Sequence, residues 1–403
     1  MNAAATTMER QRAWRGPALL SFGFRPFFLL GALWAALAMG LWVAMLAGRL
    51  TLPTAFDPVS WHAHEFLFGY LGAIIAGFLL TAVPNWTGGL PVTGWPLAGL
   101  VAAWLAGRAA VSVSQGLPPL AVAAADLALV ALLAFLLGRE IVVGKNWRNL
   151  PVVGLLAVFG CANTLFHWEA ATGAYAAQGM GLRLGLAAVL MMIAVIGGRI
   201  VPSFTRNWLA KQGEGRLPTP PMQRFDLAAL GVLLAALLAW VVLPVAAFTG
   251  MALALAGGLH LARMARWAGD RTFAEPLVTV LHVGYAFVPL GALVGAVEIL
   301  GYSWIGPGSA QHLWTAGGLG LMTLAVMTRA TLGHTGRALT AGRGTMAIYA
   351  AVVVAVLARI AAGAWPEAAD ALHSLSGMGW IGAFAGFAAL YGPMLLRPRQ
   401  AAG

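Results

Sequence analysis

Two histidines and a glutamate stand together in the stretch Trp61–Tyr70, WHAHEFLFGY, at the start of a strongly apolar run. Neutral imidazole is the usual side chain for binding iron or copper in apolar surroundings, so His62 and His64 are candidate metal ligands. Residues two apart on a helix point about 200° away from each other. We therefore expect the two histidines to serve two sites on opposite flanks of one helix, unless both only reach toward lipid headgroups. A carboxylate such as that of Glu65 is costly to bury inside an apolar, membrane-spanning segment. Glu65 is expected to hydrogen-bond a ligand or relay protons, and it is the candidate catalytic residue.

Three further histidines are candidate cofactor ligands because of their depth in apolar runs. His312 is expected at the start of its apolar run, on the outer side of the membrane. The alternative interpretation is that it is only an interfacial residue. His282 lies about two turns into its run, roughly 10 Å from the inner end at the rise of an α-helix, and the alternative is an ordinary packing role. His334 lies near the inner surface, where it could bind a haem propionate, a phosphate or nothing.

Other ionisable residues in or beside the apolar runs are weaker candidates. His167 lies at the outer end of its run, and His373 is expected in the last outer loop. His260 and Arg263 are expected at a cytoplasmic helix end, with basic groups that reach the surface. Asp126 is a lone acid, and it is either a proton-path residue or an acid at a wet cavity.

The elements that carry these residues are membrane helices. The sequence is 60% hydrophobic and 9% charged, whereas a soluble domain has about 25% charged residues. Its apolar runs approach the roughly 20 residues that a spanning helix needs. We expect an all-α, polytopic membrane protein with twelve transmembrane helices in a single domain, residues 1–403. The predicted spans are 26–47, 61–84, 95–112, 117–138, 150–168, 180–200, 225–243, 245–264, 275–298, 310–328, 345–363 and 377–396.

The formal net charge of +11 is explained by orientation in a membrane. With a cytoplasmic N-terminus, which carries Arg10 and Arg12, 20 of the 24 Lys and Arg residues fall on the inner side. Because basic residues favour cytoplasmic loops, the pattern predicts that both termini are cytoplasmic, and it needs no nucleic acid. The first apolar run is expected to be a retained helix rather than a cleaved signal. The single Cys161 cannot form an internal disulfide or a multi-thiolate site, so any metal must be bound by histidine.

An internal repeat is suggested by three helix starts. Pro26, Pro151 and Pro276 each have a charge or Asn one or two residues before them and stand 125 residues apart. The next helix in each set ends where Thr, Arg and Gly replace the apolar run. We expect three tandem four-helix units, residues 20–140, 145–270 and 271–397, with a pseudo-threefold arrangement in which helices two, six and ten are equivalent. The alternative is that Ala-, Leu- and Gly-rich membrane segments simply look alike.

Six motifs resemble the NnrS family of bacterial inner-membrane proteins. They are FRPFFLLGALWA, WHAHEFLFGY, AGFLLTAVPNWTG, GGRIVPSFTRNWL, LHVGYAFVPLGAL and LMTLAVMTRATLGHTGR. Together they cover about residues 20 to 340, and the last two helices carry no signature. The family is described as twelve-span, haem- and copper-containing, and tied to nitric oxide metabolism and resistance.

The resemblance implies one or two haem b groups, copper as a further cofactor, and nitric oxide as the relevant molecule. We expect one haem to be held by His62 or His64 together with His312, and a second, inner cofactor by His282 with His334. Arg199 and Arg329 in the shared motifs are further candidate cofactor-binding residues. The arrangement is also similar to the catalytic subunit of haem–copper oxidases and nitric oxide reductases, although this chain has no recognisable set of three copper histidines on helices six and seven.

The expected function is that of a redox enzyme of the bacterial inner membrane, which reduces nitric oxide to nitrous oxide with electrons from quinol or a periplasmic carrier. Haem would supply the electron chemistry, and the protein would supply ligands and proton access. Two alternatives remain open at this stage. One is a transporter with a histidine transit site, and the other is a haem-based sensor or protective protein that binds nitric oxide without turnover.

Overall fold

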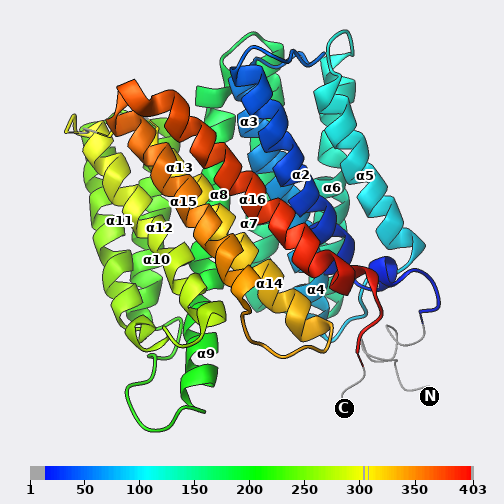
Figure 1. Ribbon diagram of the computed structural model, residues 1–403, viewed down its shortest axis with the longest axis vertical. Coiled ribbons are helices and arrows are strands. Elements are labelled where there is room, and N and C mark those ends of the chain that lie inside the picture. Colours follow the sequence, from blue (N-terminus) through cyan, green and yellow to red (C-terminus); the bar gives the residue numbers. More distant parts are fainter. Residues whose placement is uncertain (1–13, 303–304, 307, 401–403) are drawn as a thin grey trace. The chain divides into compact units, whose positions relative to one another are not determined.

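The chain forms helices at each of the twelve predicted runs. The computed structural model describes residues 14–302, 305–306 and 308–400, and these residues contain no strand. Arg10 and Arg12 lie outside the described residues. The helical stretches (Figure 1) are α2 (Phe24–Leu46); α3 (Pro58–His64), η2 (Glu65–Tyr70) and α4 (Leu71–Thr87); α5 (Trp95–Ser112); α6 (Pro119–Val143); α7 (Leu150–Ala171); α8 (Met180–Met192), η5 (Ile193–Gly197) and α9 (Gly198–Leu209); α10 (Arg224–Val242); α11 (Ala247–Ala265); α12 (Pro276–Ile299); α13 (Ser309–His312), η7 (Leu313–Leu321) and α14 (Met322–His334); α15 (Arg343–Ala364); and α16 (Ala369–Leu396). Short 3-10 turns are η1 (Ala18–Ser21), η3 (Trp147–Asn149), η4 (Ala176–Gln178), η6 (Gly269–Arg271) and η8 (Pro366–Ala368).

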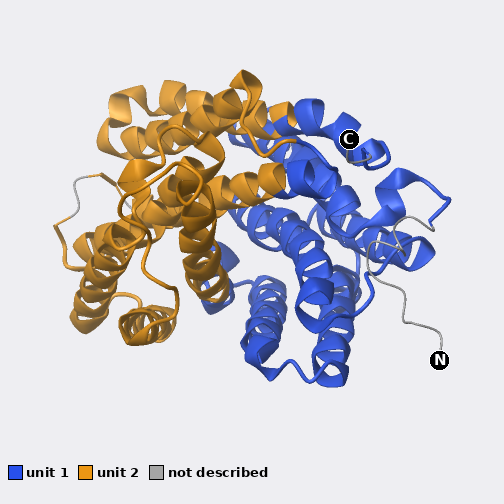
Figure 2. Ribbon diagram, turned by 90° about the horizontal axis from the view of Figure 1, so that it is seen from below, with its two compact units in different colours: residues 1–185, 330–337, 387–403 blue, residues 186–329, 338–386 orange. Residues whose placement is uncertain are grey.

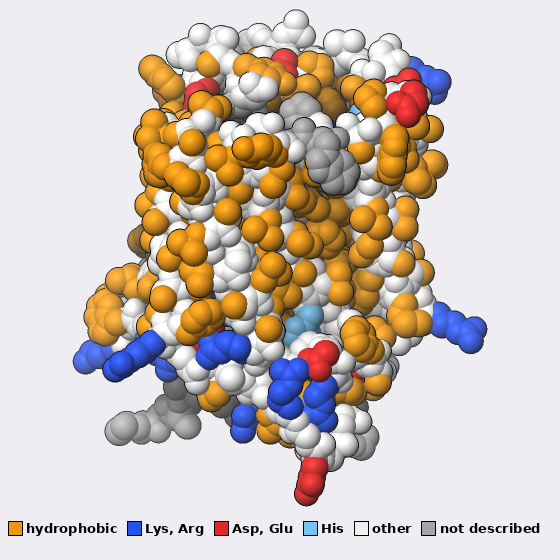
Figure 3. All heavy atoms as spheres, turned by 90° about the vertical axis from the view of Figure 1, so that its left-hand side faces the viewer, with side chains coloured by type: hydrophobic (Ala, Val, Ile, Leu, Met, Phe, Trp, Pro, Cys, Tyr) orange, Lys and Arg blue, Asp and Glu red, His pale blue; other side chains and the backbone are white. Residues whose placement is uncertain are grey.

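Nine of these stretches, counted over the described residues, are long and apolar enough to cross a bilayer. The prediction of an all-helical, multi-pass membrane protein is therefore confirmed, and crossing by all twelve stays a prediction. Large apolar side chains point outward from α6, where Leu120 is 82%, Phe135 68% and Val143 73% exposed. On the face shown in Figure 3, apolar side chains fill the middle and Lys and Arg gather toward the lower edge. Such a surface suits hydrocarbon rather than water.

Two details of the prediction are wrong. His373 was expected in an outer loop, but it lies within α16, because the Ala-rich segment after Pro366 is already helical. Arg263 and His260 were expected to reach the surface, but both are buried, at 0% and 1% exposure. They turn inward because Asp226 and Tyr285 supply polar partners there: Arg263 donates to Asp226 Oδ1 at 2.9 Å, and His260 Nδ1 lies 2.9 Å from the Tyr285 hydroxyl.

The chain divides into two compact units (Figure 2). Unit 1 comprises residues 1–185, 330–337 and 387–403, and unit 2 comprises residues 186–329 and 338–386. The predicted single domain and three tandem repeats stay predictions. Within unit 1, α2 packs so closely on α4 that a side chain at Gly77 would collide with the Phe28 ring and the Phe27 β-carbon. Small residues allow this approach between membrane helices.

Both ends of the described chain meet in unit 1. The Arg25 guanidinium, at the start of α2, donates to the backbone carbonyls of Leu395 and Arg397 at 2.8 and 2.7 Å. These carbonyls belong to the last turn of α16 and the residues after it, where a helix has no further amides to bond. The two ends therefore lie on one side of unit 1, and their predicted cytoplasmic orientation stays a prediction.

A π-helical segment interrupts three of the helical stretches. η2, η5 and η7 lie in the second, sixth and tenth stretches, which are the ones predicted to be equivalent. π-helical turns are rare in proteins, and those that occur are often found at functional sites. His64 directly precedes η2 and His312 directly precedes η7. The presence of a π-helical segment in all three stretches agrees with the predicted repeat, which stays a prediction.

Candidate metal centre

The position of His64 follows from the way α3 begins. Asp57 caps the helix and accepts hydrogen bonds from the amides of Val59 and Ser60, both at 3.0 Å. Pro58 occupies the first turn, where a missing amide costs nothing. The two histidines then enter different surroundings, as helical geometry predicts: His62 stacks on Trp42 with 4.5 Å between ring centroids, whereas His64 is fully buried.

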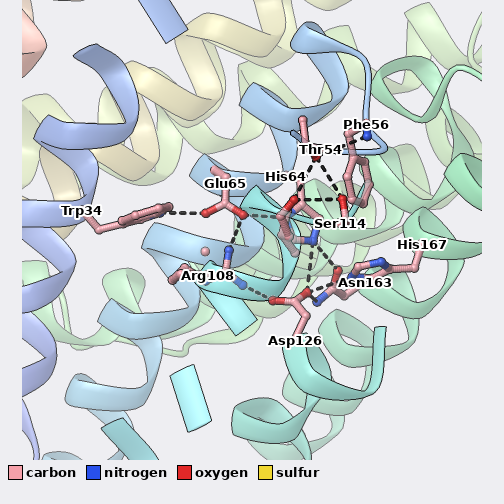
Figure 4. A network of polar contacts seen from close by, with 12 residues as sticks. Trp34, Thr54, Phe56, His64, Glu65, Arg108, Ser114, Asp126, Asn163 and His167 are labelled. Atoms are coloured by element: carbon pink, nitrogen blue, oxygen red, sulfur yellow. Dashed lines mark hydrogen bonds and ion pairs between the residues drawn. The ribbon is translucent and has the colours of Figure 1, made fainter. Parts of the chain in front are cut away.

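His64 lies at the centre of a polar cluster built by several helices of unit 1 (Figure 4). Its Nε2 atom is 3.1 Å from Asp126 Oδ2 on α6 and 3.1 Å from Asn163 Oδ1 on α7. His167, one turn after Asn163, brings its own Nε2 to 3.0 Å from the same Asp126 oxygen. The Asn163 amide donates to that oxygen at 2.7 Å. Two imidazoles and one carboxylate oxygen therefore converge on one point.

A second layer of polar contacts holds this cluster in place. Arg108 on α5 forms ion pairs with Glu65 Oε1 and with Asp126 Oδ1. Glu65 also lies 3.1 Å from His64 Nδ1 and accepts from the Trp34 indole at 2.8 Å. Gly69 makes room for the pair, because a side chain there would collide with Arg108 and Glu65. Glu65 therefore makes the bond to a candidate ligand that the sequence predicts.

With both histidines neutral, the charges and protons of the cluster do not balance within the protein. Two carboxylates and one guanidinium leave a formal net charge of −1 in the interior of unit 1. A neutral imidazole has one N–H group, yet His64 presents one nitrogen to Glu65 and the other to the oxygens of Asp126 and Asn163. If Nδ1 donates to Glu65, Nε2 directs a lone pair at two acceptors. One additional cation between Nε2 and these oxygens removes both problems.

Comparison with known families assigns the chain. The family model described as NnrS protein matches residues 18–399. The chain belongs to the NnrS family. The match also covers the last two helices, which carry no recognisable signature. No curated protein matches the chain significantly. Membership of the NnrS family fits a multi-pass membrane protein connected with nitric oxide.

The cluster fits a single metal ion. His64, Asp126 and His167 each offer a ligand atom, and the three atoms lie within 4.8 Å of one another. Two histidines and one carboxylate form a known ligand set for non-haem iron, and imidazole also suits copper. A carboxylate that bonds the second nitrogen of a ligating histidine is a common feature of metal sites, and Glu65 meets this requirement for His64.

The same residues do not fit the haem that the NnrS resemblance implies. Both nitrogens of His64 face polar groups, and four rings pack around it with centroids 5.1 to 5.4 Å away. These rings are Phe56, Phe68, Phe166 and His167. Within the described residues of unit 1, they leave no slot for a porphyrin beside His64.

The other predicted site residues are distributed over the two units. His334 belongs to unit 1 and packs between Phe22 and Phe24, at 5.5 and 5.4 Å between ring centroids. His312 belongs to unit 2, where its Nδ1 atom lies 2.9 Å from the Gly308 carbonyl. This carbonyl can only accept, so Nδ1 carries the proton and Nε2 carries the lone pair that a haem or metal would require. The pairing of His312 with His62 or His64 stays a prediction, and the rings around His64 make His62 the better candidate for a haem.

The remaining candidates of unit 2 lie in protein surroundings. His282 Nε2 is 2.8 Å from the Thr205 hydroxyl, and Gly269 lies against the other ring nitrogen. This resembles the packing role that the sequence leaves open, and an inner cofactor at His282 stays a prediction. The Arg329 guanidinium lies over the Phe204 ring, 4.2 Å from its centroid. Arg199, in α9, is not brought into the cluster of unit 1.

Sequence reasoning missed several members of the cluster. Arg108 appears in the sequence only as an exception to the charge pattern, and Asp126 only as a lone acid. His167 is noted for its depth but not paired, and Asn163 is not noted. The available signal is the loop between α5 and α6, since Arg108 shortly precedes it and Asp126 shortly follows it. An antiparallel hairpin brings two such residues to the same depth, where opposite charges are expected to pair.

Proposed function

We propose that this NnrS-family protein is a membrane metalloprotein that reduces nitric oxide, with a redox-active iron or copper ion held by His64, Asp126 and His167. The observation that carries the proposal is the position of the His64 ring, whose two nitrogens both face oxygen acceptors. A cation at Nε2 satisfies this geometry and offsets the net charge of −1. Family membership supports nitric oxide as the substrate.

When bound, the ion would supply the electron chemistry and an open position for nitric oxide. The reaction consumes two nitric oxide molecules, two electrons and two protons, and it yields nitrous oxide and water. Quinol or a periplasmic carrier is the proposed electron donor. A haem b on His312 Nε2 remains compatible with this scheme, since the Gly308 carbonyl fixes the required tautomer.

The protein's own residues would hold the ion and its charge. Arg108 engages Asp126 Oδ1 and so leaves Oδ2 directed at the two imidazoles. Glu65 holds the proton of His64 on Nδ1, which keeps Nε2 available as a ligand. Burial of the whole group strengthens these charge interactions, because no bulk water screens them.

Replacing Glu65 by Gln tests this assignment. The amide keeps an acceptor for His64 Nδ1–H but loses the negative charge, so we expect metal to remain and nitric oxide consumption with a reductant to fall about tenfold or more. Metal content is measured by mass spectrometry, and nitric oxide with an electrode. Glu169→Gln is the matched control, since this acid bonds the amide of Met180 outside the cluster, and it should keep the wild-type rate.

Three results would contradict the proposed function. Purified wild-type protein without iron or copper would exclude the metal centre, and His64 would then hold a second proton instead. Protein that binds nitric oxide but never consumes it with a reductant would be a sensor or a protective protein. Equal rates for wild type and Glu65→Gln would remove Glu65 from the mechanism.

A further inference from the structure

A small cavity adjoins the cluster of unit 1. It has a volume of about 50 Å³. His167 lines it together with Phe56, Ser114, Val122 and Ala170. A cavity needs roughly 10–15 Å³ to hold one water molecule, so this one has room for a few water-sized or diatomic molecules. It therefore connects a candidate metal ligand with the end of the helix bundle of unit 1.

The walls of the cavity are mostly apolar. Ser114 is its main polar neighbour besides His167, but the Ser114 hydroxyl is already engaged. It donates to the Val111 carbonyl at 3.0 Å and accepts from the Ala55 amide at 2.8 Å. An anion that entered the cavity would lose its hydration without gaining compensating donors. A small uncharged molecule would enter at little cost.

Phe56 borders both this cavity and the two ligand histidines. It lines the cavity, and its ring centroid is 5.4 Å from that of His64 and 5.6 Å from that of His167. The side chain is only 8% exposed. A molecule that moves from the cavity toward the ligand nitrogens therefore passes close to this ring.

The loop that carries Phe56 is fixed to the end of α5. Thr54 donates to the Val111 carbonyl at 2.8 Å, and the Gln115 amide donates to the Pro53 carbonyl at 2.9 Å. These bonds hold the backbone before Phe56, and Asp57 caps α3 directly after it. The Phe56 ring is thus held in the wall of the cavity, and the size of the ring limits the width of the passage.

We propose that this cavity is the access route by which a small uncharged molecule of the size of nitric oxide reaches the cluster, and that Phe56 sets its size limit. The identity of the molecule rests on the proposed function, whereas the route itself depends only on the cavity and its walls. Charged products or substrates, such as nitrite, are excluded by the apolar lining. Phe56 acts as a specificity-determining residue and does not ligate the ion.

Cysteine labelling of metal-free protein tests the route independently of any metal. In a Cys161→Ser background, Val122→Cys should react with neutral methyl methanethiosulfonate at least about tenfold faster than Val130→Cys. Val130 is the matched control, because both valines are buried in α6 and Val130 does not line the cavity. A negatively charged methanethiosulfonate should react with Val122→Cys much more slowly than the neutral reagent. Ala170→Cys provides a second position if Val122→Cys does not fold.

Equal labelling of the cavity and control positions, or equal rates with the neutral and charged reagents, would overturn the route. The size limit is tested on metal-loaded protein by stopped-flow binding of nitric oxide. Phe56→Ala should raise the association rate and Phe56→Trp should lower it, each about tenfold, with metal content unchanged. Identical rates in both variants would remove Phe56 from the proposal. Normal labelling in a protein that binds no metal would contradict the proposed function and leave the route intact.

Discussion

Replacing His64 by Ala is expected to abolish metal binding at the cluster. Loss of a residue that only supports a metal ligand weakens binding about 10- to 100-fold, so loss of a direct ligand should exceed about 100-fold. The variant removes the one side chain that contacts Glu65, Asp126 and Asn163 together. Metal content after dialysis against a weak chelator, measured by mass spectrometry, gives the result.

His62→Ala is the matched control for this experiment, because it removes the same type of side chain two residues earlier on α3. His62 stacks on Trp42 and lies outside the cluster, so the variant should keep the ion. Retention of full metal content in His64→Ala, or equal loss in both variants, would show that the ion lies elsewhere.

Replacing Arg108 by Leu is expected to destabilise the protein more than any other single change in the cluster. Arg108 is 3% exposed and pairs with both Glu65 and Asp126, so its loss leaves two buried carboxylates without their cation. Removal of one partner from a buried ion pair typically costs about 3–5 kcal/mol of unfolding free energy. Reversible unfolding in mixed detergents, or thermal melting of the purified protein, measures the loss.

Two further variants isolate the charge effect of Arg108. Glu65→Gln combined with Arg108→Leu should recover part of the lost stability, because one buried charge is removed. Arg216→Ala breaks an ion pair with Asp270 in which both side chains are more than half exposed, and it should change stability little. A double variant no more stable than Arg108→Leu alone would show that packing, not charge, explains the role of Arg108.

Much of the helical framework could be predicted from the sequence. Twelve apolar runs interrupted by Pro, Gly and charged residues mark the helices within a few residues, as at α5 and α12. The errors occur where a helix extends beyond its apolar run into polar or Ala-rich sequence. α14 continues to His334 and α16 begins at Ala369, because polar and Ala-rich residues outside the apolar run still form helical hydrogen bonds.

The composition of the cluster was harder to predict, for a physical reason. A helix that is apolar on all sides has no polar face from which its rotation can be inferred. The depth of His64 and His167 is therefore visible in the sequence, but not that both point at Asp126. The π-helical segment after His64 adds to the difficulty, since it turns Glu65 into the same interior as its neighbour.

X-ray absorption spectroscopy of purified protein at the iron and copper edges tests the metal centre most directly. We expect one ion with nitrogen and oxygen neighbours and the outer-shell scattering of two imidazoles, and loss of one imidazole contribution in His167→Ala. A spectrum of porphyrin nitrogens alone, or an ion whose environment is unchanged in His167→Ala and His64→Ala, would contradict the assignment of His64, Asp126 and His167 as its ligands.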